Sequence, residues 1–151
     1  MLTAKKILIV EDCRDLLNLQ GDMLALMGWD TILADSGETM SKLEQDLPCV
    51  VLLNLRTPVM NGVKVAATLK AHPGYKNIPI LAASGLSNGL TRERCLALGC
   101  DDFIAKPLAL AELETHLTNL FFAERRKAIR ATAPIQCGNS SAATKVEQCQ
   151  P

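Results

Sequence analysis

Polar side chains directly follow four short apolar segments of this 151-residue chain. Glu11 and Asp12 follow the first segment, Asn54 follows another, and Ser84 and Lys106 follow two later ones. If these segments are parallel strands, their carboxyl ends meet at one edge of a sheet, and open α/β sheets bind ligands in the crevice beyond that edge. Two acids, an amide, a hydroxyl and an ammonium group would then face one crevice and could hold a polar ligand by charge and hydrogen bonds.

The segments that position these groups have the pattern of buried strands. Ile7 to Val10 and Val50 to Leu53 are continuous apolar runs, typical of parallel strands covered by helices on both faces. Ile78 to Ala83 and Phe103 to Ala105 are expected to form two further strands. The mixed segment Asp30 to Ala34 suits a strand at the sheet edge.

Apolar residues at spacings of three and four predict helices between the strands and after the last one. The inward faces are expected to be Leu16, Leu19, Met23 and Met27 in residues 13–27; Met40, Leu43 and Leu47 in a helix capped by Ser36; Val63, Ala66 and Leu69 in residues 62–71; and Leu110, Leu113, Leu117, Leu120 and Phe121 in the last helix. Residues 91–98 would form a short helix stopped by Gly99. Because parallel strands need crossover helices, the alternation predicts an α/β fold with a doubly wound five-stranded parallel sheet.

Composition and charge narrow the class of protein. Hydrophobic residues make up 48% of the chain and the formal net charge is +0, so no excess of basic residues points to nucleic acid. The first apolar run is too short for a signal peptide or a membrane span, and we therefore expect a cytoplasmic protein with six reduced cysteines and no membrane association. Residues 1–130 are expected to form one domain, and the small, polar residues 131–151 a disordered tail.

The residues at the strand ends resemble a known signalling domain. The acidic pair Glu11-Asp12, the segment Leu53 to Gly62, Ser84 and the Lys106-Pro107 dipeptide are similar to the receiver domain of two-component response regulators, over roughly residues 5–125. The resemblance implies a flavodoxin-like (βα)5 fold with strand order 2-1-3-4-5. It also implies a phosphorelay signalling module that is not an enzyme, and that in its family takes a phosphoryl group from a partner histidine kinase.

One position departs from the family pattern. Asn54 stands where the resemblance implies a phospho-accepting aspartate, and an uncharged amide oxygen is a poor nucleophile, so we expect no acyl phosphate there. By resemblance Glu11, Asp12 and the backbone carbonyl of Arg56 would hold Mg²⁺, weakly because the third carboxylate is missing. No organic cofactor is implied.

The remaining site residues also take their roles from the resemblance. Lys106 would contact a phosphoryl oxygen in an active receiver, and here it is expected to pair with Asp12 or to hydrogen-bond Asn54. Ser84 and Phe103 resemble the hydroxyl and aromatic pair that rearranges on activation. With no phosphoryl group to pull Ser84 inward, that movement lacks its driving ligand.

The leading hypothesis is a pseudo-receiver that acts by protein–protein docking. Its partner would be a histidine kinase, another signalling protein or a second copy of the chain, bound through the fourth helix, fifth strand and fifth helix, about residues 90–125. The alternative is a conventional phospho-accepting regulator that carries an engineered aspartate-to-asparagine change at position 54. A thiol switch that uses Cys137 and Cys149 is a third hypothesis.

Enzyme classes with similar folds fit the sequence less well. A phosphohydrolase of the haloacid dehalogenase type needs an Asp-x-Asp segment after a strand, and residues 54–56 contain no acid. A flavodoxin needs a phosphate-binding loop after the first strand, where Glu11 and Asp12 would repel a phosphate. Taken alone, that acidic pair could also be an ordinary solvated helix start.

Overall fold

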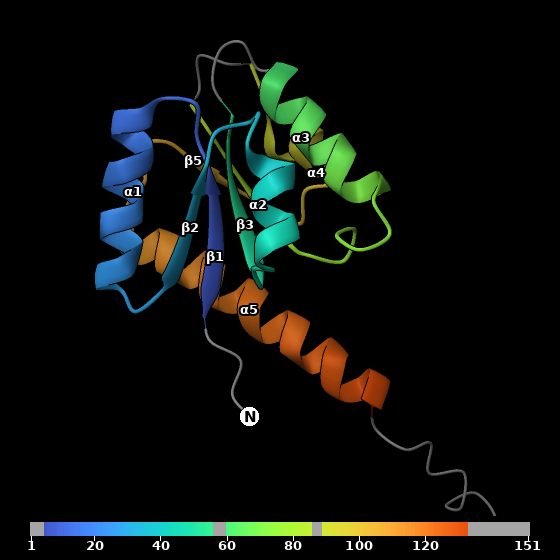
Figure 1. Ribbon diagram of the computed structural model, residues 1–151. Helices are drawn as coiled ribbons and strands as arrows, with labels where there is room; N and C mark the ends of the chain where they lie inside the picture. Colours follow the sequence, from blue (N-terminus) through green and yellow to red (C-terminus); the bar gives the residue numbers. More distant parts are fainter. Residues whose placement is uncertain (1–4, 56–59, 86–88, 133–151) are drawn as a thin grey trace, which may run out of the picture.

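The computed structural model describes residues 5–55, 60–85 and 89–132. Within them, five strands alternate with five helices (Figure 1). In chain order they are β1 (Lys6–Val10), α1 (Arg14–Leu26), β2 (Asp30–Ala34), α2 (Thr39–Gln45), β3 (Val50–Leu55), α3 (Met60–Ala71), β4 (Ile80–Ser84), α4 (Arg92–Ala97), β5 (Asp102–Ala105) and α5 (Leu110–Thr132). In this part of the chain, no helix is long and apolar enough to cross a membrane.

The strands form one parallel sheet in the order β2-β1-β3-β4-β5, with β2 at an edge. The predicted fold class and strand order are therefore confirmed. The register pairs Val10 with Leu53, Leu55 with Ser84, and Ser84 with Ala105. The carboxyl ends of four strands consequently meet at one edge, which is where the candidate site residues lie.

Helices cover both faces of the sheet and bury a separate apolar layer on each. The layer under α2, α3 and α4 includes Leu43, Leu69 and Cys95. The layer under α1 and α5 includes Leu17 and Leu117, and it also contains the edge-on ring contact between Trp29 and Phe121, whose centroids are 6.0 Å apart. Burial of each strand on both faces explains the continuous apolar runs in the sequence.

The buried face of α1 differs from the predicted one. Leu17, Gln20, Gly21 and Leu24 face the sheet, whereas Leu19, predicted to be buried, is 54% exposed. The helix approaches β2 closely at Gly21, where a Cβ atom would lie only 2.9 Å from Leu33 Cδ2. The prediction failed because it placed every polar residue of α1 outward, and the buried residue Gln20 breaks that rule.

Other predicted boundaries also need correction. Ser36 does not cap α2, because the helix begins at Thr39 and Ser36 bonds Asp12 instead. Leu47 lies after the end of α2 and is 58% exposed. The strand β3 continues through Leu55, so Asn54 lies within a strand rather than after it.

The last helix is longer than predicted. α5 runs through Thr132, so the first two residues assigned to a disordered tail are helical. Figure 1 shows its C-terminal half continuing past the end of the sheet. Residues 133–151, with Cys137 and Cys149, lie outside the described residues.

Candidate functional site

The predicted site residues lie at the carboxyl edge of the sheet, as far as the structure describes them. Glu11 follows β1, Asn54 is the fifth residue of β3, Ser84 ends β4, and Lys106 follows β5. Arg56 lies outside the described residues. Glu11 is 1% exposed and Asn54 is 7% exposed. Buried polar groups are costly without partners, so the contacts of these two side chains decide what the site can do.

Glu11 is a buried carboxylate held by a backbone amide and a lysine. Its Oε1 accepts a hydrogen bond from the backbone N–H of Cys13 at 3.0 Å, and Lys106 Nζ lies 3.8 Å from Oε2. Lys106 is thus paired with Glu11 in the structure, and its expected contact with Asp12 or Asn54 stays a prediction. The ammonium group offsets the cost of burying the Glu11 charge.

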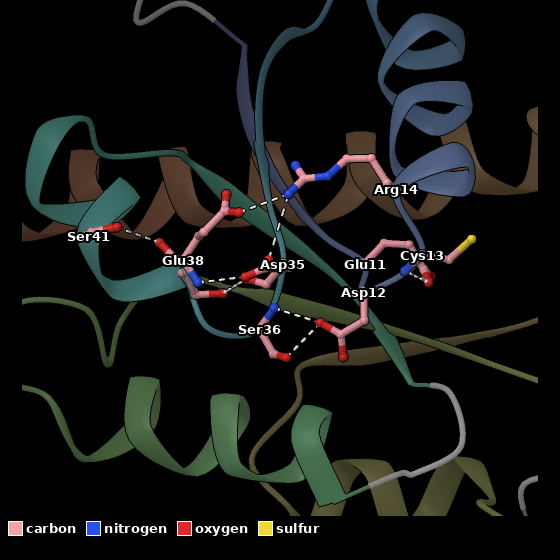
Figure 2. A network of polar contacts seen from close by, with 9 residues as sticks. Glu11, Asp12, Cys13, Arg14, Asp35, Ser36, Glu38 and Ser41 are labelled. Carbon is pink, nitrogen blue, oxygen red and sulfur yellow. Dashed lines mark hydrogen bonds and ion pairs between the residues drawn. The ribbon is translucent and has the colours of Figure 1, made fainter.

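Asp12 is exposed, and its oxygens accept hydrogen bonds from two neighbouring segments, of which Figure 2 shows the one at Ser36. Oδ1 accepts from the backbone N–H of Ser36 at 2.8 Å and from its hydroxyl at 2.6 Å. Oδ2 accepts from Asn61 Nδ2 at 3.3 Å. Asp12 therefore fixes the loop before α2 and contacts the first turn of α3.

Asn54 is paired with Gln20, a residue that the sequence analysis did not single out. Asn54 Nδ2 donates to Gln20 Oε1 at 2.8 Å and to the carbonyl oxygen of Val10 at 3.1 Å. Gln20 Nε2 donates back to Asn54 Oδ1 at 3.1 Å. Both polar atoms of the Asn54 side chain are thus engaged with α1 and β1. The position of Gln20 between Leu17 and Leu24, on one face of α1, could have indicated in the sequence that this glutamine is buried.

Ser84 and Phe103 occupy the strands beside this edge. The Ser84 hydroxyl donates to the carbonyl oxygen of Gly85 at 3.3 Å, and the Ser84 carbonyl accepts the backbone N–H of Lys106 at 2.9 Å. Phe103 is half-buried and packs against the apolar layer under α2, α3 and α4. The backbone thus holds the ends of β4 and β5 together, with Lys106 directly after them.

A second polar network lies next to Asp12 and joins α1 to α2 (Figure 2). Arg14 donates to Glu38 Oε1 at 2.9 Å and lies 3.7 Å from Asp35 Oδ2. The hydrogen bond to Glu38 raises the pKa of Arg14 above its ordinary value. Arg14 is exposed and the two acids are half-buried, so we expect these ion pairs to contribute little to stability.

The predicted docking face contains a partly buried charge network. Asp102 of β5 accepts hydrogen bonds from Arg92 of α4 at 2.9 Å and from His116 Nδ1 of α5 at 2.5 Å. Its burial alone would raise the pKa of Asp102, but the bonds from His116, the Phe103 backbone N–H and Arg92 outweigh burial and lower that pKa. Asp102 therefore links α4, β5 and α5.

The fold and this edge together define a class of protein: a flavodoxin-like α/β domain with a polar site at the carboxyl ends of its strands. The sequence model of the response regulator receiver domain matches residues 7–118. The chain belongs to this family.

Several curated proteins are similar to the chain over most of its length. Transcriptional regulatory protein PrrA of Mycobacterium tuberculosis is 30% identical over 133 residues, which are 87% of this chain and 55% of PrrA. Transcriptional regulatory protein CpxR of Escherichia coli is 34% identical over 108 residues, which are 72% of this chain and 45% of CpxR. The chain spans about half the length of these relatives.

Solved receiver structures have the same fold. The receiver domain of a signal transduction histidine kinase from Syntrophus aciditrophicus is 27% identical with a TM-score of 0.70, and the match covers 89% of this chain and 99% of that one. The receiver domain of the sensor histidine kinase PA1611 from Pseudomonas aeruginosa is 28% identical with a TM-score of 0.68, and the match covers 79% and 98%. The PA1611 structure has a magnesium ion coordinated in its active site cleft.

The corresponding donors in this chain fit a tightly held Mg²⁺ poorly. Mg²⁺ prefers carboxylates and waters in octahedral geometry. Here Asp12 Oδ1 already accepts two hydrogen bonds from Ser36, a lysine ammonium lies 3.8 Å from Glu11, and the Asn54 amide is bonded to Gln20. Among the described residues, no three His, Cys, Asp or Glu side chains are grouped to hold a metal ion.

Proposed function

We propose that this chain is a receiver-type signalling module that acts by protein docking and is not phosphorylated at position 54. The observation that carries the proposal is the state of the Asn54 side chain. Its oxygen accepts from Gln20, and its nitrogen donates to Gln20 and Val10. A neutral carboxamide bonded in this way offers no charged oxygen to attack a phosphoryl group.

Its neighbours support the same proposal. In a phosphorylated receiver, a lysine ammonium would stabilise the phosphoryl oxygens. Lys106 instead lies beside the buried Glu11 carboxylate, and the Ser84 hydroxyl donates to the adjacent backbone carbonyl of Gly85. The side chains that would respond to a phosphoryl group thus have partners within the chain.

The proposed partner is a histidine kinase or another signalling protein, and a second copy of the chain is possible through the same face. One relative supports a link to kinases: hybrid signal transduction histidine kinase G of Dictyostelium discoideum is 34% identical over 112 residues, which are 72% of this chain and 3% of that protein. The proposed docking face is formed by α4, β5 and α5. The Arg92–Asp102–His116 network fixes these three elements relative to one another.

Phosphoryl transfer to the chain tests the proposal directly. The native protein is incubated with Mg²⁺ and acetyl phosphate, and its intact mass is measured, with a conventional aspartate-containing receiver domain as the positive control. The mass of the native chain should not change while the control gains a phosphoryl group. An acid-stable, base-labile adduct on any residue of the crevice would contradict the proposal.

The alternative of an engineered aspartate-to-asparagine change makes a separate prediction. It requires an aspartate codon at position 54 in the genome, and sequencing the natural gene decides between the two. A natural asparagine supports the docking module, since the inward-facing Gln20 then matches it. A natural aspartate supports the conventional regulator.

The thiol-switch hypothesis gains no support from the described cysteines. Cys95 and Cys100 are buried in the apolar layer under α2, α3 and α4. Burial raises the pKa of Cys100 to about 12. Reactive thiols have a lowered pKa, so burial opposes redox chemistry at these two residues.

A further inference from the structure

We propose that Gln20 is a positioning residue that holds the side chain at position 54 against α1 and β1. Residues 20 and 54 together would then determine whether the side chain at position 54 is available to a ligand in the crevice. This inference rests on the proposed function and deepens it, because it names the residue that holds the Asn54 side chain in its hydrogen-bonded position. It predicts that Gln20 weakens Mg²⁺ binding even when an aspartate is restored at position 54.

The geometry of the pair carries the inference. Gln20 and Asn54 are both buried, and their side chains exchange two hydrogen bonds, of 2.8 Å and 3.1 Å. The second Nδ2 hydrogen of Asn54 is used by the Val10 carbonyl at 3.1 Å. A buried amide with all these partners is costly to turn outward, because each bond would have to be replaced. The amide is therefore held between β1 and α1.

Gln20 would also hold an aspartate. In Asn54→Asp, the new carboxylate cannot donate to Val10 O or to Gln20 Oε1, but it can still accept the hydrogen bond that Gln20 Nε2 donates to Asn54 Oδ1 in the native chain. A hydrogen bond from an amide to a carboxylate is stronger than one between neutral groups. The restored carboxylate thus remains tied to α1 by Gln20, which competes with a cation for its oxygens.

Leucine is the informative replacement for Gln20. It is close to glutamine in size, suits a helix, and would join the apolar layer formed by Leu17 and Leu24. It has no group that can bond the residue at position 54. The matched control is Asn18→Leu, which makes an equivalent amide-to-leucine change on the exposed face of the same helix.

The experiment compares Mg²⁺ binding, measured by calorimetry, in Asn54→Asp, Asn54→Asp/Gln20→Leu and Asn54→Asp/Asn18→Leu. Loss of one strong hydrogen bond to the carboxylate should tighten Mg²⁺ binding by roughly tenfold or more in the Gln20→Leu double variant. The Asn18→Leu double variant should bind like Asn54→Asp. Equal affinities for Asn54→Asp and its Gln20→Leu derivative, including no detectable binding by either, would overturn the inference.

A second measurement uses the native chain and does not depend on the folding of any variant. Solvent exchange of side-chain amide hydrogens is followed by NMR, and those of Asn54 should exchange roughly tenfold or more slowly than those of the exposed Asn18. Equal exchange rates would show that Asn54 is not held, and would overturn the inference. Phosphorylation of the native chain by acetyl phosphate would instead contradict the proposed function, so the two failures are distinguishable.

Discussion

Replacement of Asn54 by aspartate should destabilise the fold even though it changes few atoms. The substitution removes the Nδ2 donor, which makes bonds of 2.8 Å to Gln20 Oε1 and 3.1 Å to Val10 O. It also places a negative charge at a position that is 7% exposed, on the same edge of the sheet as the buried Glu11. Lys106 already lies beside Glu11 and can offset only part of the added charge.

The size of the effect follows from these contacts. Two neutral hydrogen bonds are each worth about 1 kcal/mol, and a Val10 carbonyl left without a donor adds about 1 kcal/mol or more. The remaining hydrogen bond from Gln20 Nε2 becomes stronger when its acceptor is a carboxylate, and this recovers part of the loss. We therefore expect the free energy of unfolding to fall by about 2–3 kcal/mol near neutral pH without metal. This is a large share of the roughly 5–15 kcal/mol that stabilises a typical domain.

Urea denaturation of the native chain and Asn54→Asp, in the presence of a chelator, measures the loss. The control is Asn18→Asp, which makes the same chemical change on the exposed face of α1 and should alter the free energy of unfolding by about 0.5 kcal/mol or less. Addition of Mg²⁺ should stabilise Asn54→Asp more than the native chain, because a cation that binds only the folded state shifts its equilibrium. An aspartate variant as stable as the native chain without metal would refute this reasoning.

Three further changes test other parts of the structure. Asp102→Asn should lower the free energy of unfolding by about 1.5–3 kcal/mol near neutral pH. Because the pKa of Asp102 is lowered in the folded state, the stabilisation is present above the pKa of the unfolded state and is lost as the pH falls through the pKa of the folded state. Urea titrations of both proteins at several pH values should therefore show the difference vanish at low pH. Gly62→Ala places a Cβ atom 2.2 Å from Leu55 Cδ2, so the gain in helix propensity should be outweighed by an overpacking cost of about 1–3 kcal/mol in the same assay. Cys100 should react with a thiol reagent near neutral pH only after unfolding, because burial raises its pKa to about 12.

Local sequence patterns predicted the sheet because its strands are buried on both faces. The runs Ile7 to Val10 and Val50 to Leu53 contain only apolar residues, and the structure places both in central strands. Spacing of polar residues after these runs also predicted which side chains would lie at one edge. These features depend only on which residues are buried, and the order of apolar and polar residues in the sequence indicates this.

The errors concern polar residues whose partners are distant in sequence. The predicted inward face of α1 contained only apolar residues and so left out Gln20, yet Asn54, 34 positions away, provides two bonds that allow the burial of Gln20. Ser36 was predicted to cap α2, but its hydroxyl and backbone N–H both donate to Asp12. Such pairings depend on how the elements are packed, and periodicity contains no information about them.

These pairings also limit how the domain can be controlled. A ligand shifts a conformational equilibrium only by binding one state more tightly than another. A phosphoryl group or cation at this crevice would have to displace the Lys106–Glu11 ion pair or the Gln20–Asn54 amide pair before it gained any contact. A protein partner at α4, β5 and α5 pays no such cost, since it would bind the arrangement that Asp102 already holds. In the proposed function, docking at this face therefore needs no rearrangement of the crevice.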